Sequence, residues 1–237
     1  MNNYTSNDLL VWKTLFERQR ENLKTKGCKI YMDCLDSMTS VLNANEIPNF
    51  ESINKWFERS TEWKIEVVPG MIPVEDFFDL LAEKRFCSST WLRSMDELDY
   101  LKEPDMFHDI FGHIPLLANP TYSEFAHRFG KLGQCFKGNV PMLNQLQRLY
   151  WFTIEFGLIN EKGDVKAFGA GIISSFGETN RVAAEDCKII PFDIGAVLLK
   201  EFENDVLQED YFIINSLEEL QVGLQSASVR LARKIVQ

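Results

Sequence analysis

Two of the three histidines in this 237-residue chain lie close together, in the segment EPDMFHDIFGHIP that begins at Glu103. His108 and His113 are five residues apart, and residues with that separation are rotated by about 140° on a straight α-helix. Both imidazoles can face one point only if the helix ends or distorts between them. Gly112 and Pro115 suit such a break, because glycine favours a turn past a helix C-terminus and proline cannot continue a helix. We therefore expect His108 in a last helical turn and His113 just after it.

A carboxylate further along the chain completes a set of three metal-binding side chains. Glu155 lies near the end of a largely apolar stretch from Met142 to Phe156, which predicts a long helix. A carboxylate among aromatic and aliphatic side chains is costly to bury without a partner, which indicates a cation beside it. Two imidazoles and one carboxylate hold non-haem Fe(II) in oxygenases. The alternative is a pair of ordinary buried or capping histidines, and the spacing alone leaves it open.

The composition favours a globular enzyme over a membrane or nucleic-acid-binding protein. The chain is 45% hydrophobic and long enough to bury one large core. No apolar run approaches the roughly 20 residues of a membrane helix. A net charge of −10 without a Lys/Arg cluster argues against nucleic acid and membrane as partners. Five scattered cysteines and an N-terminus without a signal-peptide core predict reduced thiols in the cytoplasm.

Hydrophobic periodicity predicts a mainly α-helical chain with small β elements. Apolar stripes indicate helices around Trp12–Leu23 and Tyr31–Leu42. Alternating or β-branched runs predict short strands at 63–67, 165–168, 188–192 and 211–214. Ser216 followed by Glu219 forms a capping box, which predicts a last helix over 216–236. With no repeat or linker in the sequence, we expect one domain over residues 1–237.

Three blocks of the sequence resemble the signature blocks of the pterin-dependent aromatic amino acid hydroxylases. The blocks EPDMFHDIFGHIPLL, RLYWFTIEFGLI and GAGIISSFGE occur in the family's order and at similar separations. The upstream segments RQRENL, VVPGMIPVEDFFDLLAEKRF and LRSMDELDYLKEPD are similar to the compact bacterial phenylalanine 4-hydroxylases. The resemblance runs from about Val11 to about Ser216. It implies the family's catalytic-domain fold, without a separate regulatory domain or a tetramerisation arm, and therefore a monomer.

The resemblance also implies a reaction. Iron held by His108, His113 and Glu155 would act with a tetrahydropterin, either tetrahydrobiopterin or a related compound, and with O2 to hydroxylate the ring of a free amino acid. Phenylalanine to tyrosine is the expected conversion. Tryptophan or tyrosine as the substrate is the alternative within the family, because a methylene-scale difference in a pocket is worth only about 1–3 kcal/mol. A non-catalytic metal-binding protein and a zinc hydrolase are the alternatives outside it, although the chain lacks an HExxH helix.

Arginine and aromatic residues form the expected substrate pocket. Arg93 falls on the family's substrate-carboxylate arginine, and its planar fork suits a carboxylate. Asp105 falls on the acid that orients this arginine. Read without the resemblance, Arg93 is a solvated charge and Trp151 a core residue. The other residues that the resemblance assigns to the substrate are Tyr100, Pro104, Trp151, Ser174 and Ser175.

A second group of residues is expected to hold the pterin. Phe77 matches the family's pterin-stacking phenylalanine, although it also fits an apolar core stripe with Leu81. Asp109 stands where many animal members carry a glutamate and is expected to reach the pterin through water. Tyr150 is expected on the open side of the iron, as a further catalytic residue. The remaining pterin contacts are expected from the backbone of Val68, Gly70 and Ile72.

Overall fold

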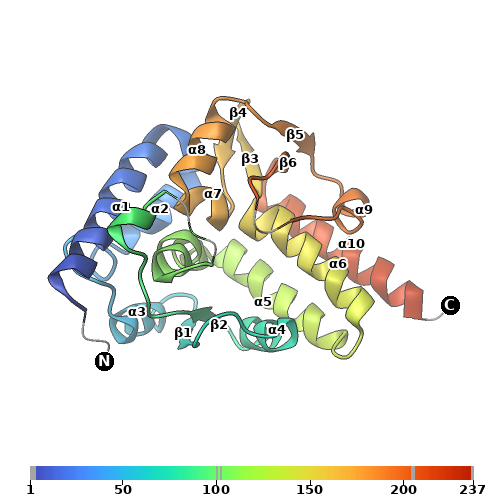
Figure 1. The fold of residues 1–237 in the computed structure, drawn as a ribbon. Helices are drawn as coiled ribbons and strands as arrows, with labels where there is room; N and C mark the ends of the chain where they lie inside the picture. Colours follow the sequence, from blue (N-terminus) through green and yellow to red (C-terminus); the bar gives the residue numbers. More distant parts are fainter. Residues whose placement is uncertain (1–3, 100, 102, 204–205, 236–237) are drawn as a thin grey trace.

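Helices make up most of the molecule, and two small sheets lie on opposite sides of them (Figure 1). The structure is a computed structural model that describes residues 4–99, 101, 103–203 and 206–235, without the side chains of 234 and 235. The fold class predicted from the sequence is confirmed. The helices are α1 Ser6–Lys26, α2 Lys29–Ser37, α3 Phe50–Phe57, α4 Val74–Ala82, α5 Pro120–Cys135, α6 Val140–Tyr150, α7 Ala170–Ser174, α8 Phe176–Ala183, α9 Ile194–Val197 and α10 Leu217–Ile235. The strands are β1 Lys64–Val67, β2 Arg85–Ser88, β3 Leu158–Glu161, β4 Asp164–Ala167, β5 Lys188–Pro191 and β6 Asp210–Ile214.

Within the described residues, four short turns of other helix types complete the fold. Two are 3₁₀ turns, η1 Met95–Glu97 and η3 Pro115–Ala118. Two are π-helical turns, η2 His108–His113 and η4 Trp151–Glu155. The π turns carry the three predicted metal-binding side chains, which makes them the most informative elements of the fold.

The first two helices follow their apolar stripes to different extents. α1 begins in a capping box, where the Thr5 hydroxyl accepts from the Asp8 N–H and the Asp8 carboxylate accepts from the Thr5 N–H. Its predicted stripe is buried, as expected. The helix expected over Tyr31–Leu42 ends earlier, at Ser37. Leu42 is nevertheless fully buried, because the turns after α2 keep it against the core. The apolar residues of the predicted stripe are therefore buried even beyond Ser37, where the helix itself ends.

α5 packs closely against α4, at the glycines of α5. A Cβ at Gly133 would lie 2.1 Å from Cγ of Phe78, and one at Gly130 would lie 2.3 Å from the backbone nitrogen of Ala82. The two helices can therefore approach only where α5 has no side chain. This contact holds α4, and with it Phe77, in a fixed place beside the core.

The smaller sheet positions two segments of the site. β1 and β2 are parallel, with Lys64 opposite Arg85, and α4 connects them. Carboxyl ends of parallel strands meet at one edge of a sheet, and here the Val68 N–H donates to the Ser88 carbonyl just beyond the strands. The loop that starts at Val68 and the segment from Ser89 to Arg93 consequently run from the same edge. β1 was predicted from its alternation, whereas β2 was not.

The larger sheet has the strand order β4-β3-β6-β5. β3 and β4 form an antiparallel hairpin, and β6 is parallel to both β3 and β5. The strands expected near 165–168, 188–192 and 211–214 are confirmed to within a residue or two, and β3 was not expected. Because β3 directly follows η4 and pairs with β6, the segment before β6 lies close to Trp151.

The last helix packs against α5 and begins with a shifted cap. The Ser216 hydroxyl accepts from the Glu219 N–H, as in a capping box, but the Glu219 carboxylate accepts from the Asn215 N–H. Position 236 of the expected helix lies outside the described residues. Among the residues that are described, every helix is too short or too polar to cross a bilayer.

Candidate active site

The helix that carries His108 does not end after it, as we expected, but widens into the π turn η2. A π turn bonds residue i to residue i+5, so side chains five residues apart come to lie on one side. The Nε2 atoms of His108 and His113 are 3.1 Å apart as a result. The expected distortion is present, whereas the expected helix end is wrong.

Gly112 has a different function from the one its position suggested. It lies inside η2 rather than past a helix end, and a Cβ there would lie 3.0 Å from the Ala170 carbonyl oxygen. The missing side chain lets α7 pack directly on η2. Ser174, at the end of α7, thereby places its hydroxyl 2.9 Å from Nδ1 of His108. This contact leaves Nε2 of the same ring to face the other two predicted ligands.

Glu155 comes from the second π turn. The single helix expected over 142–156 is α-helical only to Tyr150, and η4 then continues to Glu155. The Phe156 N–H donates to the Trp151 carbonyl at 2.7 Å, an i to i+5 bond. Oε1 of Glu155 lies 3.2 Å from Nε2 of His108, and Oε2 lies 3.1 Å from Nε2 of His113.

The three side chains fit a metal ion. Their nearest donor atoms are separated by 3.1–3.2 Å, and ligands at about 2.1 Å in adjacent positions on one metal lie about 3 Å apart. Burial lowers the pKa of His108 to about 4, so its imidazole is neutral at pH 7, the form that binds metals. Burial raises the pKa of Glu155, but the two nearby imidazoles outweigh it and the pKa lies below its ordinary value. Nδ1 of His113 is buried without a hydrogen-bond partner.

Arg93 and Asp105 form a buried, two-point ion pair. Nε of Arg93 donates to Oδ2 of Asp105 at 2.9 Å, and Nη2 donates to Oδ1 at 2.8 Å. Asp105 is fully buried and also accepts from the His108 N–H at 3.1 Å. One carboxylate thus orients the arginine and fixes the start of η2, which couples the predicted substrate residue to a predicted metal ligand.

A cavity of about 610 Å³ brings most of the predicted residues together. A volume of this size accommodates an amino acid together with a small bicyclic compound. Asp105 lies behind Arg93 rather than in the wall, and Tyr100 lies outside the described residues. The predicted residues in the wall are Val68, Gly70, Ile72, Phe77, Arg93, Pro104, His108, Asp109, His113, Tyr150, Trp151, Glu155, Ser174 and Ser175.

The aromatic wall links the predicted pterin residue to the predicted metal ligands. The rings of Phe77 and Tyr150 meet edge to face at 5.0 Å, and Tyr150 is nearly parallel to His113 at 6.2 Å. Phe86, on the unpredicted strand β2, lies 4.7 Å from the His113 ring. Phe77 therefore belongs both to the aromatic packing and to the cavity wall. Its position is compatible with the core stripe and with the predicted contact to the pterin.

Asp109 is held on the side of the cavity where the two parallel strands end. Its Oδ2 accepts from the Ser89 N–H at 2.9 Å, directly after β2. Burial raises the pKa of its carboxyl to about 7. The side chain is therefore fixed beside the segment that begins with Ser89 and faces the same cavity as Phe77.

The sequence analysis missed several residues of the cavity. Phe176 directly follows the predicted serine pair, so its place in that block was an available signal. Glu178, on α8, ends the same block and carried the same signal, whereas the remaining residues come from loops without periodicity. These further wall residues include Met71, Trp91, Leu98, Glu178, Phe202, Val206 and Leu207.

Comparison with known proteins shows the class to which the fold and site belong. Residues 1–236 match the family described as biopterin-dependent aromatic amino acid hydroxylase, and the chain belongs to this family. The phenylalanine-4-hydroxylase of Vibrio cholerae is 41% identical over 211 residues, which cover 89% of this chain and 72% of that protein.

Solved structures agree. Chromobacterium violaceum phenylalanine hydroxylase with bound iron(III) and 7,8-dihydrobiopterin superposes with a TM-score of 0.89 at 36% identity, covering 98% of this chain and 84% of that one. The phenylalanine hydroxylase of Colwellia psychrerythraea gives a TM-score of 0.90 at 34% identity, covering 98% and 91%.

Proposed function

We propose that this chain is an Fe(II)- and tetrahydropterin-dependent monooxygenase that converts L-phenylalanine to L-tyrosine with O2. The observation that carries the proposal is the convergence of His108, His113 and Glu155 in the wall of one cavity, which Arg93 also lines. The relatives named for phenylalanine hydroxylation, and the neighbour that holds iron and a pterin, support the same reaction.

Iron at the three ligands, together with the reduced pterin, would supply the electrons that O2 activation needs. The ligand residues are preorganised, because both π turns and α7 pack around them. The Ser174 hydroxyl orients the His108 ring through Nδ1. These residues therefore hold the donor atoms in place before any ligand binds.

Arg93 binds the carboxylate of the amino acid in this proposal. Asp105 accepts from Nε and from one N–H of Nη2, so N–H groups of Nη1 and Nη2 remain for a second carboxylate. Such a bidentate contact fixes the orientation of the substrate as well as its affinity. The aromatic ring then lies between Pro104 and Trp151, with Ser175 near the polar end.

The pterin occupies the side of the cavity formed by α4 and the loop after β1. Phe77 offers a flat apolar face, and the backbone of Val68, Gly70 and Ile72 offers hydrogen-bonding groups. Asp109 would contact the pterin through water, and Tyr150, whose ring lies beside those of Phe77 and His113, would face the open side of the iron. A cavity that holds both molecules excludes bulk water from the reacting atoms.

Anaerobic loading with Fe(II), followed by parallel assays of phenylalanine, tyrosine and tryptophan with tetrahydropterin and O2, tests the proposal. We expect tyrosine from phenylalanine, dependent on both iron and pterin. A preferred product from tryptophan or tyrosine would change the substrate. No product from any of the three, despite bound iron, would contradict the proposed reaction. Loading with Zn(II) is the control, and hydrolytic activity with zinc alone would indicate a hydrolase.

We also propose that the protein works as a monomer in the cytoplasm and binds small molecules rather than nucleic acid or membrane. The acidic charge of −10 and the five cysteines, all free in the structure, support this. Light scattering after size exclusion tests the oligomeric state, and a mass near 27.4 kDa is expected.

A further inference from the structure

Gln208 is a buried polar residue that the proposed reaction does not use. Its side chain is 6% exposed, and each of its polar groups has a partner. Oε1 accepts from the indole Nε1 of Trp151 at 3.0 Å. Nε2 donates to the carbonyl oxygens of Glu203 at 2.8 Å and Val206 at 3.0 Å. A buried amide with its acceptor and both donors bonded is held in one orientation.

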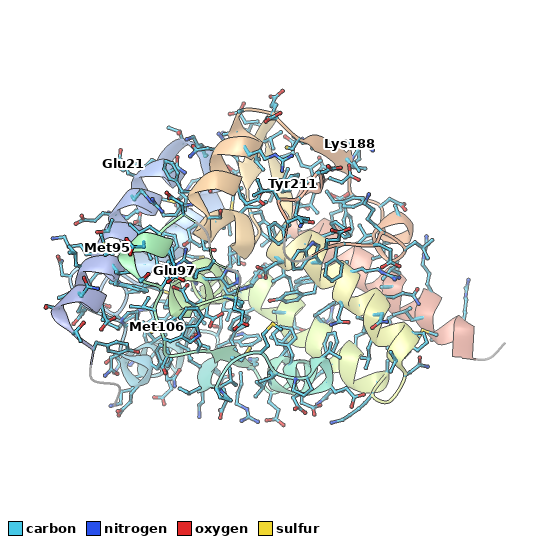
Figure 2. All side chains as sticks on the ribbon, viewed as in Figure 1. Glu21, Met95, Glu97, Met106, Lys188 and Tyr211 are labelled. Atoms are coloured by element: carbon cyan, nitrogen blue, oxygen red, sulfur yellow. The ribbon has the colours of Figure 1, made fainter. Side chains whose placement is uncertain are left out.

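The backbone around Gln208 is fixed as well. Its carbonyl accepts from Nη1 of Arg181, on α8, at 2.6 Å. Tyr211, three residues further along, lies beside α8 (Figure 2), and its hydroxyl donates to the carboxylate of Glu178. Gln208 is therefore anchored to α8 on one side and bonded to Trp151 on the other.

Trp151 needs this bond to have a single position. Its indole stacks on Phe202, with centroids 4.4 Å apart and planes 15° apart, and it also contacts Phe156 at 4.6 Å. Stacked rings attract over a range of offsets, so stacking fixes the plane of the indole better than its place within that plane. A hydrogen bond requires a defined distance and direction. The bond to Gln208 thus fixes the edge of the ring.

We propose that Gln208 is a positioning residue that sets the ring selectivity of the enzyme by holding Trp151. The inference rests on the proposed function, in which Trp151 forms the wall beside the substrate ring. With the indole fixed, the pocket cannot widen to admit a two-ring side chain. Without the bond the indole can shift, and discrimination between phenylalanine and tryptophan falls.

Gln208→Met is the test variant, because methionine is similar in length and shape but forms none of the three hydrogen bonds. Gln221→Met is the matched control, since Gln221 lies on α10, which contributes no described residue to the cavity wall. Trp151→Phe removes the indole N–H and keeps an aromatic ring. The double variant, with both Gln208→Met and Trp151→Phe, completes a double-mutant cycle.

The first readout is independent of activity. The chain has five tryptophans, and ¹⁵N labelling gives one indole N–H resonance for each, with that of Trp151 identified by its loss in Trp151→Phe. We expect Gln208→Met to shift the Trp151 resonance and to speed its exchange with water, while Gln221→Met leaves it unchanged. An unchanged Trp151 resonance in Gln208→Met would overturn the inference.

The second readout is the ratio of kcat/KM for phenylalanine to that for tryptophan. Gln208→Met should lower this ratio about fivefold, the size of one net hydrogen bond. In the Trp151→Phe background the same change should have less than about a twofold effect. An equal effect in both backgrounds would show that Gln208 acts through folding alone. A wild-type enzyme that forms no tyrosine would instead contradict the proposed function, whatever the resonance does.

Discussion

The proposed metal-binding centre and the rim of the cavity are built in opposite ways. The centre, formed by His108, His113 and Glu155, lies on two π turns that pack against α7, and its donor atoms are 3.1–3.2 Å apart. The rim, formed by Met71, Leu98, Val206 and Leu207, comes from loops, and Met71 is 77% exposed. The proposed metal ligands are fixed by packing, whereas the rim residues lie on loops.

The two regions also differ in how glycine is used. At the centre, a Cβ at Gly171 would lie 3.0 Å from Oε1 of Glu155, so α7 can approach the carboxylate only without a side chain there. Next to the rim residue Met71, a Cβ at Gly70 would meet nothing within 4 Å. The same residue type therefore marks close packing in one region and an open loop in the other.

In the rim, Leu98 packs against the core, and polar contacts also attach the segment around it. Figure 2 shows Met95 and Glu97 of η1 in front of α1, and Arg18 of α1 donates to the Leu98 carbonyl at 2.9 Å. The same arginine pairs with the exposed Asp99. Contacts of this kind contribute little to stability, so substitutions should have large effects at the centre and small effects at the rim.

Removing the carboxylate should have the largest effect. Glu155→Ala leaves two ligands, so we expect iron binding to weaken and turnover to fall by more than about 10³-fold. Iron content and tyrosine formation are measured on the same sample. Glu124→Ala, at an exposed ion pair with Arg128, is the control. Normal activity in Glu155→Ala would remove Glu155 from the metal site.

Arg93→Ala should raise the KM for the amino acid by about 100-fold, because a charge-assisted two-point contact is worth about 2–3 kcal/mol. It also leaves Asp105 buried without its cation, which should lower the free energy of unfolding by about 3–5 kcal/mol. Iron content should not change. Steady-state kinetics and thermal unfolding separate the two effects, and an unchanged KM would place the substrate carboxylate elsewhere.

Ser174→Ala should weaken iron binding by about 10- to 100-fold, since the His108 ring loses the hydroxyl that orients it. Anaerobic Fe(II) titration measures this. Ser175→Ala is the neighbouring comparison: Ser175 caps α8 by accepting from the Glu178 N–H, so its loss should cost about 1 kcal/mol of stability and leave iron affinity unchanged. Equal iron affinities in both variants would remove Ser174 from its positioning role.

A rim substitution should have the smallest effect. Met71→Ser changes an exposed side chain, so we expect the free energy of unfolding to stay within about 0.5 kcal/mol of wild type. Iron affinity should also remain the same. Chemical denaturation and iron titration check both expectations, and a large loss of either would show that the rim is coupled to the centre more tightly than its contacts indicate.

The centre was predictable from the sequence because its residues carry chemistry at defined spacings. His108, His113 and Glu155 formed a recognisable ligand set, and the blocks around them resembled one family. The π turns were not predictable, since propensity distinguishes helix from strand but not a helix of i to i+5 bonds. That is why Gly112 was assigned to a helix end rather than to a contact with α7.

The rim and the two unpredicted strands lacked such signals. β2 and β3 have four residues each, as β1 does, but their sequences RFCS and LINE do not alternate between polar and apolar residues as β1 does. Gln208 is polar and lies in a loop, so nothing in its neighbourhood indicated burial or a bond to an indole far away in the chain. Contacts between segments distant in sequence depend on the folded arrangement, and local patterns do not contain them.

The central claim is that two π turns bring three side chains to one iron ion. Crystals grown from protein loaded with Fe(II) under anaerobic conditions, with anomalous diffraction measured at the iron absorption edge, test it directly. We expect one strong peak between Nε2 of His108, Nε2 of His113 and the carboxylate of Glu155. A strong peak at other residues would contradict the account. So would the absence of a peak in protein that still forms tyrosine in an iron-dependent reaction.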